Sequence, residues 1–147
     1  MAGARLRSLR VARLRTLAGW TQAELAIELG ASGRRRVGQW ERGLEQPQPR
    51  FVPLLAAALN VEPLELLAVD RNDPPLLALR LAAGLTLTEV AAASGIAYSS
   101  YHRLEHGLIV ADPTVATAKA LARTVGVTND QILRAAARSR TEHRPRH

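Results

Sequence analysis

Apolar residues recur at helical spacing in short segments of this chain, and polar or glycine-containing stretches separate these segments. The first segment carries an apolar stripe formed by Leu6, Leu9, Val11, Leu14 and Leu17. Two later segments show the same spacing, one through Leu54, Leu55, Ala58 and Leu59 and the other through Val115, Ala118, Leu121 and Val125. Such patterns are typical of amphipathic helices that bury one face. The sequence therefore predicts an all-α protein built from short helices.

Two further segments begin with the same helix start signal. Thr21 is followed three residues later by Glu24, and Thr86 is followed in the same way by Glu89. At this spacing the threonine hydroxyl and the glutamate carboxylate each accept a hydrogen bond from the other residue's backbone N–H. Glycines that favour a helix end then follow, at Gly30 and Gly95. We expect a short, capped helix in each place.

These matching signals belong to an internal repeat. Residues 19–26 align with 84–91, residues 40–43 with 104–107, and residues 58–61 with 124–127. Each copy spans about 65 residues, and we expect five short helices in each. The predicted domains are 1–69 and 76–137, joined by a polar, proline-stiffened linker at 70–75 and followed by a frayed basic tail at 138–147.

In each copy, a helix that ends at a glycine is followed by a turn of about three residues and a second short helix. This is the helix-turn-helix pattern, in which the second helix projects its amino-terminal end toward the major groove of DNA. The positions that must face inward are Leu25, Ala26, Leu29, Val37 and Trp40 in the first copy, and Val90, Ala91, Ile96, Tyr101 and Leu104 in the second. Trp20 and Trp40 are therefore expected in the core and not on a binding surface.

Both copies resemble the lambda-repressor-like, or Xre-like, helix-turn-helix family. The matching residues are Thr21-Gln22-Ala23-Glu24-Leu25-Ala26 and Trp40-Glu41-Arg42-Gly43 in the first copy, and Gly126-Val127-Thr128 in the second. The resemblance covers roughly residues 6–69 and 76–134, and its recurrence in two copies makes it specific. It implies two tandem five-helix domains and a sequence-specific, repressor-like transcriptional regulator.

The resemblance also implies roles for individual residues. Gln22, which opens the second helix, is implied to contact the DNA backbone and to support the recognition helix, the third helix of its copy. The other implied DNA contacts are Arg34, Arg35, Arg36, Gln39 and Arg42 in the first copy and Tyr98, Ser99, Arg103 and His106 in the second, with Arg42 and His106 facing phosphate. Two structural ion pairs are implied as well, Arg15 with Glu41 and Arg80 with Glu105.

Two departures from the family pattern distinguish the copies. The turn of the first copy, at residues 31–33, has one extra residue, which leaves the register of the following three arginines open by one position. The second copy has Leu87 where the family has glutamine, and its recognition helix carries little charge. Arginine at the start of a major-groove helix bonds O6 and N7 of guanine. We therefore expect the first domain to supply most of the DNA recognition.

Composition supports a polyanionic partner without naming it. The chain has 147 residues and a net charge of +7, and Lys119 is its only lysine. The positive charge is therefore nearly all arginine, whose planar fork of donors suits phosphates and guanine edges. The sequence has no cysteine, no apolar run long enough to span a membrane and no continuous apolar signal segment near its start. We expect a cytoplasmic protein associated with the bacterial nucleoid.

No arrangement of residues indicates an enzyme or a cofactor. The sequence contains no nucleophile and base pair, no phosphate loop and no metal triad. His102 and His106 lie four residues apart, but no third ligand lies near them, so no metal is expected. No small-molecule site is evident either, and double-stranded DNA is the expected partner.

Two functional hypotheses stay open. In the first, the protein regulates transcription by binding duplex DNA. In the second, the second domain mediates homodimerisation or another protein contact, as in an antitoxin-like or adaptor protein, because Tyr98 and Tyr101 suit a partner surface. The short linker is expected to hold both domains as a fixed unit. That unit is either a pseudo-dimer on an asymmetric DNA site or one half of a chain dimer on a longer site.

Overall fold

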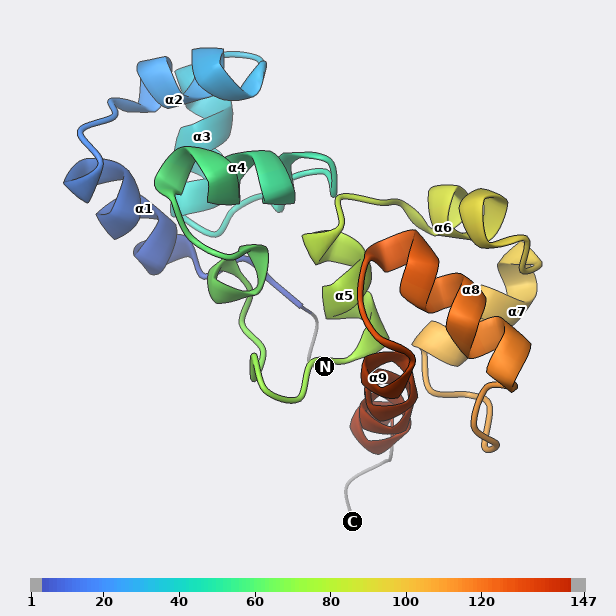
Figure 1. Ribbon diagram of the computed structural model, residues 1–147. Coiled ribbons are helices and arrows are strands. Elements are labelled where there is room, and N and C mark those ends of the chain that lie inside the picture. The colour runs from blue at the N-terminus through green and yellow to red at the C-terminus, as the bar shows by residue number, and fades with distance from the viewer. Residues whose placement is uncertain (1–3, 144–147) are drawn as a thin grey trace.

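A computed structural model describes residues 4–143 of the chain. Within this range the protein is all-helical, as the sequence predicts. Its elements are α1 (Ser8–Leu17), α2 (Gln22–Leu29), α3 (Arg34–Glu41), α4 (Phe51–Leu59), the 3-10 helix η1 (Pro63–Leu66), α5 (Leu76–Ala82), α6 (Leu87–Ser94), α7 (Tyr98–Glu105), α8 (Val115–Val125) and α9 (Asn129–His143). The elements up to η1 form the first copy, and α5 to α9 form the second copy beside it (Figure 1).

Local chemistry explains where the helices begin and end. The Thr21 hydroxyl accepts a hydrogen bond from the backbone N–H of Glu24 at 3.0 Å, and the Glu24 carboxylate accepts one from Thr21 at 2.9 Å. Thr86 and Glu89 form the same capping box at the start of α6. Gly30 ends α2 with a φ of 70°, a left-handed conformation that glycine adopts without a steric penalty. Both predicted capping boxes are confirmed.

Each copy buries its own apolar core. The first core centres on Leu25, Val37, Trp40 and Leu55. The second core centres on Val90, Tyr101, Leu121 and Ile132. Trp20 packs against the edge of the first core, so both tryptophans lie in or beside it, as the apolar pattern predicts.

The apolar stripe predicted for the first helix is wrong in part. Leu9 and Leu17 are 82% and 77% exposed, whereas Val11 and Leu14 pack inward. At about 100° per residue, the two-residue step from Leu9 to Val11 turns the helix by about 200°, to its opposite side. Leu6 lies before α1 and is buried in the first core. Only one side of α1 therefore contributes to the core.

The stripes of the two later helices are also narrower than predicted. In α4, Leu55 and Leu59 are buried, but Leu54 is exposed. In α8, Leu121 is buried and Val115 is exposed. Each helix packs against its core on one side, so the first residue of each predicted stripe lies in water.

The frayed tail predicted for residues 138–147 is wrong as far as His143, where α9 ends. Ser139 is buried, and its hydroxyl accepts a hydrogen bond from the backbone N–H of Leu76 at 3.1 Å. This bond ties α9 to the start of α5 and explains why the helix continues. The rest of the predicted tail lies outside the described residues.

A glycine at the end of α7 makes room for α9. Gly107 has a φ of 71°, and a Cβ atom there would collide with the backbone of Ser139. Arg140, the next residue of α9, donates a hydrogen bond to the Asp112 carboxylate at 2.8 Å. Helix α9 thus holds the segment between α7 and α8 in place.

The two copies share a third, smaller apolar cluster. Its buried members are Ala4, Val52, Leu67 and Ala78. Ala78 belongs to α5 of the second copy, and the other three belong to the first copy. Gly84, which follows α5, lies so close to Pro53 of α4 that a Cβ atom would clash with its ring. These contacts hold the two copies together beside the linker.

Candidate nucleic-acid interface

Helices α2 and α3 form the helix-turn-helix of the first copy, and α6 and α7 form that of the second. Helix α3 begins after Gly33, whose φ of 82° lies in the left-handed region that glycine tolerates. The turn of the second copy is one residue shorter, because α7 begins directly after Ala97. Arg34 and Tyr98 thus occupy the first positions of α3 and α7, which defines the register that the sequence left open.

Three exposed arginines, Arg34, Arg35 and Arg36, occupy the first turn of α3, which contains no acidic residue. The side chains of Arg34 and Arg35 make no hydrogen bond or ion pair with other residues in the range 4–143, whereas the Arg36 side chain lies 3.7 Å from the Glu45 carboxylate. A helix N-terminus already carries partial positive charge. Arg34 and Arg35 at this place are therefore unfavourable unless an anion from outside the described residues neutralises them, whereas Arg36 has Glu45 nearby.

The far end of α3 adds two of the predicted contact residues. Gln39 is half-buried, and Arg42 is exposed. Arg42 Nε donates a hydrogen bond to the backbone carbonyl of Gly38 at 3.3 Å, which positions its guanidinium at the helix end. Helix α3 and its last cap thus carry four exposed guanidinium groups.

A buried carboxylate anchors α3 from the inside. Glu41 is 8% exposed, and its two oxygens accept hydrogen bonds from Arg15 Nε at 2.6 Å and Arg15 Nη2 at 3.0 Å. Gln22 Nε2 donates to the same carboxylate at 3.0 Å. The hydrogen bond to Glu41 raises the pKa of Arg15 above its ordinary value. The structure thus brings these three predicted residues together and links α1, α2 and α3.

The second copy keeps the carboxylate and the arginine but replaces the glutamine. Glu105 is 7% exposed and lies 2.6 Å from Arg80 Nε. Leu87 occupies the position of Gln22, and the Tyr101 hydroxyl donates to Glu105 Oε1 at 3.0 Å instead. Burial raises the pKa of Tyr101, so its hydroxyl stays protonated and remains a donor. The additional polar link is therefore made within α7, and not between two helices.

The role of Tyr101 corrects one sequence expectation. Tyr101 is 1% exposed, so the suggestion that it serves a partner surface is wrong. The helix-turn-helix pattern predicts an inward position for Tyr101, and this prediction is confirmed. The spacing also indicates a contact between Tyr101 and Glu105, because the two residues lie four apart and therefore on the same helix face.

The outer surface of α7 differs from that of α3. Tyr98, Ser99 and Arg103 are exposed, and Arg103 is the single exposed charged residue within this helix. The rings of Tyr98 and His102 lie 6.0 Å apart, and those of His102 and His106 lie 4.1 Å apart, in stacked orientations. The second recognition helix thus presents aromatic rings where the first presents guanidinium groups.

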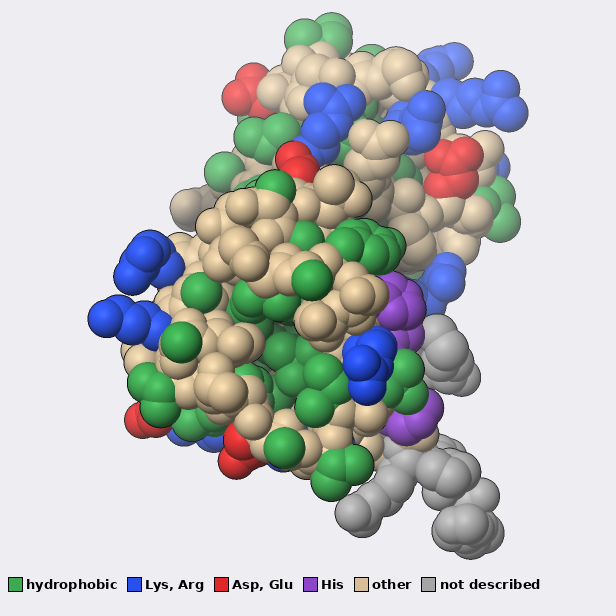
Figure 2. Space-filling view, turned by 90° about the vertical axis from the view of Figure 1, so that its right-hand side faces the viewer, with side chains coloured by type: hydrophobic (Ala, Val, Ile, Leu, Met, Phe, Trp, Pro, Cys, Tyr) green, Lys and Arg blue, Asp and Glu red, His purple; other side chains and the backbone are tan. Residues whose placement is uncertain are grey.

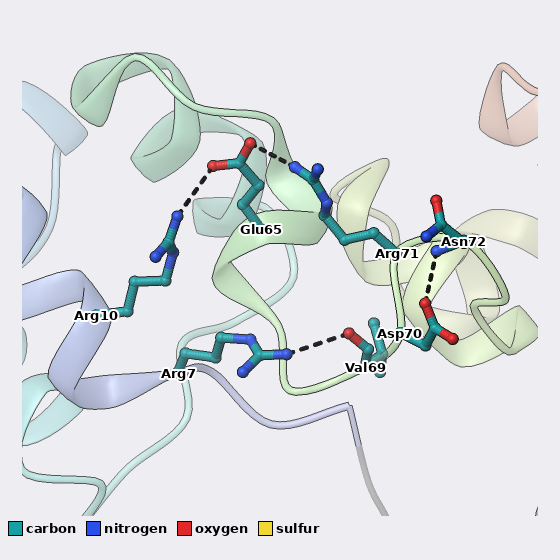
Figure 3. A pocket seen from close by; sticks show the side chains of 7 residues that line it. All are labelled: Arg7, Arg10, Glu65, Val69, Asp70, Arg71 and Asn72. Atoms are coloured by element: carbon teal, nitrogen blue, oxygen red, sulfur yellow. Dashed lines mark hydrogen bonds and ion pairs between the residues drawn. The ribbon is translucent and has the colours of Figure 1, made fainter.

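A polar cleft of about 450 Å³ lies beside the linker (Figure 3). Its lining residues are Arg7, Arg10, Glu65, Val69, Asp70, Arg71 and Asn72. Glu65 lies between Arg10 and Arg71 and forms ion pairs with both. Arg7 donates a hydrogen bond to the backbone carbonyl of Val69 at 3.2 Å. The side chains that line the cleft thus bond within the protein. Their bonds hold the amino-terminal segment and the linker against η1.

Two other features of the helices bear on function. The part of the chain that the structure describes contains no group of three or more potential metal-ligating side chains around His102 and His106 or elsewhere. In that same part, no single helix is long and apolar enough to cross a membrane. Within residues 4–143, only α5 and α6 taken together, with a bend of 90° between them, have the length and apolar composition of a membrane span.

Known proteins provide an independent comparison. A family model described as Helix-turn-helix matches the chain twice, over residues 11–66 and 76–130. No match was found among curated proteins or among solved structures. The fold, the two matched regions and the basic first turn of α3 define a DNA-binding helix-turn-helix regulator. The chain belongs to the lambda-repressor-like, or Xre-like, helix-turn-helix family, with two tandem copies of the domain.

Proposed function

We propose that this protein is a sequence-specific, repressor-like transcriptional regulator that binds the DNA major groove mainly through its first domain. Its proposed DNA-contacting residues are Gln22, Arg34, Arg35, Arg36, Gln39 and Arg42. In this proposal Arg34 and Arg35 contact base edges and prefer guanine, because a guanidinium bonds to O6 and N7 together. Gln22 and Arg42 contact backbone phosphates, which fix the orientation of α3 on the duplex.

One observation carries this proposal. The first turn of α3 holds three exposed arginines and no acidic residue, at the helix end where cations are least favourable. A DNA phosphate supplies the negative charge that this turn lacks, and a guanine edge supplies hydrogen-bond acceptors for its guanidinium groups. The same turn of α7 begins with Tyr98 and Ser99, which carry no charge. The two surfaces therefore support DNA recognition chiefly by the first copy.

Selection of bound duplexes from a random-sequence pool tests the proposal. We expect a guanine-containing consensus, bound with an affinity that falls steeply as the salt concentration rises. Replacing Arg34, Arg35 and Arg36 together by alanine is expected to weaken binding to the selected duplex by at least about 30-fold. This follows from two lost base contacts worth roughly 1–3 kcal/mol each.

A matched control separates recognition from net charge. Lys119, Arg123 and Arg134 are exposed residues of α8 and α9, and replacing them by alanine removes the same formal charge. This control is expected to retain discrimination between the selected duplex and random duplexes. Equal losses in the two triple variants, or unchanged binding by the α3 variant, would overturn the proposal.

The repressor-like part of the proposal concerns where the protein binds. A rigid two-domain body seated on a promoter blocks access by steric exclusion. A reporter gene whose promoter overlaps the selected sequence is expected to lose expression with the wild-type chain and to regain it with the α3 variant. Increased expression with the wild-type chain would contradict repression and leave DNA binding intact.

A second candidate function is a protein contact made by the second domain, either homodimerisation or an adaptor or antitoxin-like interaction. The observation that favours it is the neutral, aromatic outer surface of α7. Leu108 and Val110, in the segment between α7 and α8, are also exposed. In this proposal Tyr98, Ser99, Arg103 and His106 contribute little to DNA binding.

A further inference from the structure

An acidic residue lies among the proposed DNA-contacting groups of the first copy. The Glu45 carboxylate lies 3.7 Å from Arg36 Nη1, and the two side chains are 46% and 45% exposed. Figure 2 shows Lys and Arg side chains gathered at the upper end of the molecule, where Figure 1 has α2 and α3, with acidic side chains among them. An exposed ion pair contributes little to stability, and a carboxylate repels DNA phosphates. Neither stability nor affinity for DNA therefore accounts for an acid at this place.

The loop after α3 is held in place, which defines the position of Glu45. The backbone N–H of Glu45 donates to the Gln39 carbonyl at 3.4 Å. The next side chain, that of Gln46, accepts a hydrogen bond from the backbone N–H of Leu6 at 2.8 Å. Because Gln39 lies about one helical turn after Arg36, the loop returns along the side of α3 that carries Arg36.

Arg36 has a second partner in the turn before α3. Its Nη2 donates a hydrogen bond to the Ser32 hydroxyl at 3.4 Å. Ser32 belongs to the turn at residues 31–33, which is one residue longer than the turn of the second copy. A guanidinium has five N–H donors, so the contacts with Ser32 and Glu45 leave donors that suit a guanine edge. The chain thus orients Arg36 before any DNA is bound.

The second copy forms the same loop without either charge. In the alignment of the two copies, Ser100 occupies the position of Arg36. Ile109 occupies the position of Glu45 and packs against the second core. The loop still returns to its helix, because the backbone N–H of Leu108 donates to the carbonyl five residues earlier at 2.9 Å. The fold of this loop therefore does not require an acid, and the charge pair belongs to the surface of the first copy.

An acid beside a basic recognition helix can increase specificity, because specificity is a difference between two affinities. Random DNA is bound through its backbone phosphates, which a free guanidinium contacts at any sequence. A guanidinium that is already paired with a carboxylate gains less from a phosphate. A guanine edge offers the acceptors O6 and N7 to the remaining donors of that guanidinium. The pair therefore weakens binding to random DNA more than binding to a guanine in the right place.

We propose that Glu45 is a positioning residue that sets the DNA specificity of the first copy by holding Arg36 for a guanine contact and restraining it from phosphates. The inference rests on the proposed function, in which α3 binds the DNA major groove. Glu45 acts through Arg36 and itself touches no base.

The test compares Glu45→Gln with the wild-type chain on selected and random duplexes, by fluorescence anisotropy over a range of salt concentrations. Freed from its partner, Arg36 contacts phosphate, so binding to random duplexes is expected to become roughly 5–10-fold tighter at low salt. On these duplexes the slope of log affinity against log salt is expected to steepen by about 0.9, the value of one additional phosphate contact. Affinity for the selected duplex is expected to change by less than about two-fold, because Arg36 still reaches its guanine there. The preference for the selected duplex therefore falls.

Two controls separate the action through Arg36 from a change in net charge. Glu62 is exposed at the start of η1, and Glu62→Gln removes the same formal charge away from α3. This variant is expected to keep the wild-type slope and preference. Adding Glu45→Gln to Arg36→Ala is also expected to leave the preference of Arg36→Ala unchanged, because simple repulsion of phosphates acts on every duplex alike.

Three results would overturn this role of Glu45 alone. One is equal behaviour of Glu45→Gln and Glu62→Gln. Another is a salt slope on random duplexes that Glu45→Gln leaves unchanged. The third is a change in preference that persists when Arg36 is alanine. A wild-type chain that binds selected and random duplexes equally would instead reject the proposed function, and the role of Glu45 with it.

Discussion

Helices α3 and α7 each end at a buried glutamate that pairs with an arginine, but their outer surfaces differ. In the first copy Glu41 accepts hydrogen bonds from Arg15 and Gln22, and in the second Glu105 accepts them from Arg80 and Tyr101. The outer surface of α3 carries guanidinium groups, whereas that of α7 carries stacked aromatic rings.

The comparison shows which part of a helix-turn-helix is under physical constraint. A carboxylate that is less than a tenth exposed must keep partners, because an unpaired buried charge is strongly destabilising. When Leu87 replaces the glutamine, another donor is needed, and Tyr101 supplies it. Exposed positions carry no such penalty. The surface can therefore change its function while the internal arrangement is preserved.

The largest effect is expected from breaking the buried ion pairs. Arg15→Ala and Arg80→Ala are each expected to lower the free energy of unfolding by ~3–5 kcal/mol, because each leaves a buried carboxylate without its main partner. Arg80→Ala is expected to cost more, since the Arg80 side chain is 8% exposed and that of Arg15 is 16% exposed. Urea denaturation followed by circular dichroism measures both. Arg10→Ala, which breaks an exposed pair with Glu65, serves as the control and is expected to cost less than ~1 kcal/mol.

A smaller effect is expected from the donor that differs between the copies. Tyr101→Phe removes a buried hydrogen bond to a carboxylate and is expected to cost ~1.5–3 kcal/mol of unfolding free energy. Tyr98→Phe removes an exposed hydroxyl and is expected to have almost no effect. Adding Leu87→Gln to Tyr101→Phe is expected to recover part of the loss, because it recreates the donor of the first copy. Equal stabilities of the two tyrosine variants would contradict the inference that Tyr101 is the donor in the second copy that Gln22 is in the first.

Binding to the selected duplex tests the difference between the outer surfaces of α3 and α7. Arg35→Ala is expected to lose ~1–3 kcal/mol of binding free energy and to relax base preference at one position. Arg103→Ala, the matching removal of an exposed arginine from α7, is expected to change the affinity for the selected duplex by less than about two-fold, because α7 is not the main DNA contact. Fluorescence anisotropy with selected and random duplexes measures both variants. A larger loss for Arg103→Ala would reverse the assignment of the two domains.

The smallest effect concerns a feature that the copies share. The backbone N–H of Thr21 donates to Glu24, and this bond lowers the pKa of the Glu24 carboxylate below its ordinary value. A lowered folded-state pKa stabilises the protein above the unfolded-state pKa, and this contribution is lost as the pH falls through the folded-state pKa. The Thr21 side chain lowers the pKa of Glu24 further through its own hydrogen bond, so Thr21→Val, which removes the hydroxyl, is expected to raise that pKa. Carboxyl-carbon NMR titration checks the direction, and an unchanged titration would argue against a capping box in solution.

Much of the protein follows from its sequence. The all-helical fold, the two copies and the helix starts at Thr21 and Thr86 depend on residues within one or two turns of each other. The location of Arg34, Arg35 and Arg36 near the start of a recognition helix follows from the same local signals, whereas their register in that helix came from the structure. Such features can be predicted because the chemistry that produces them acts between near neighbours in the chain.

Other features were decided only by contacts between distant residues. Gly107 leaves room for α9 at Ser139, so part of the predicted tail is helical. Gly84 leaves room for Pro53, and the two predicted domains share a small apolar cluster. The side of α1 that is buried was set in the same way, by the elements packed against it. Packing between segments that lie far apart in the chain leaves little trace in local spacing. Because the energy of burial depends on which surfaces meet, only the tertiary structure determined these features.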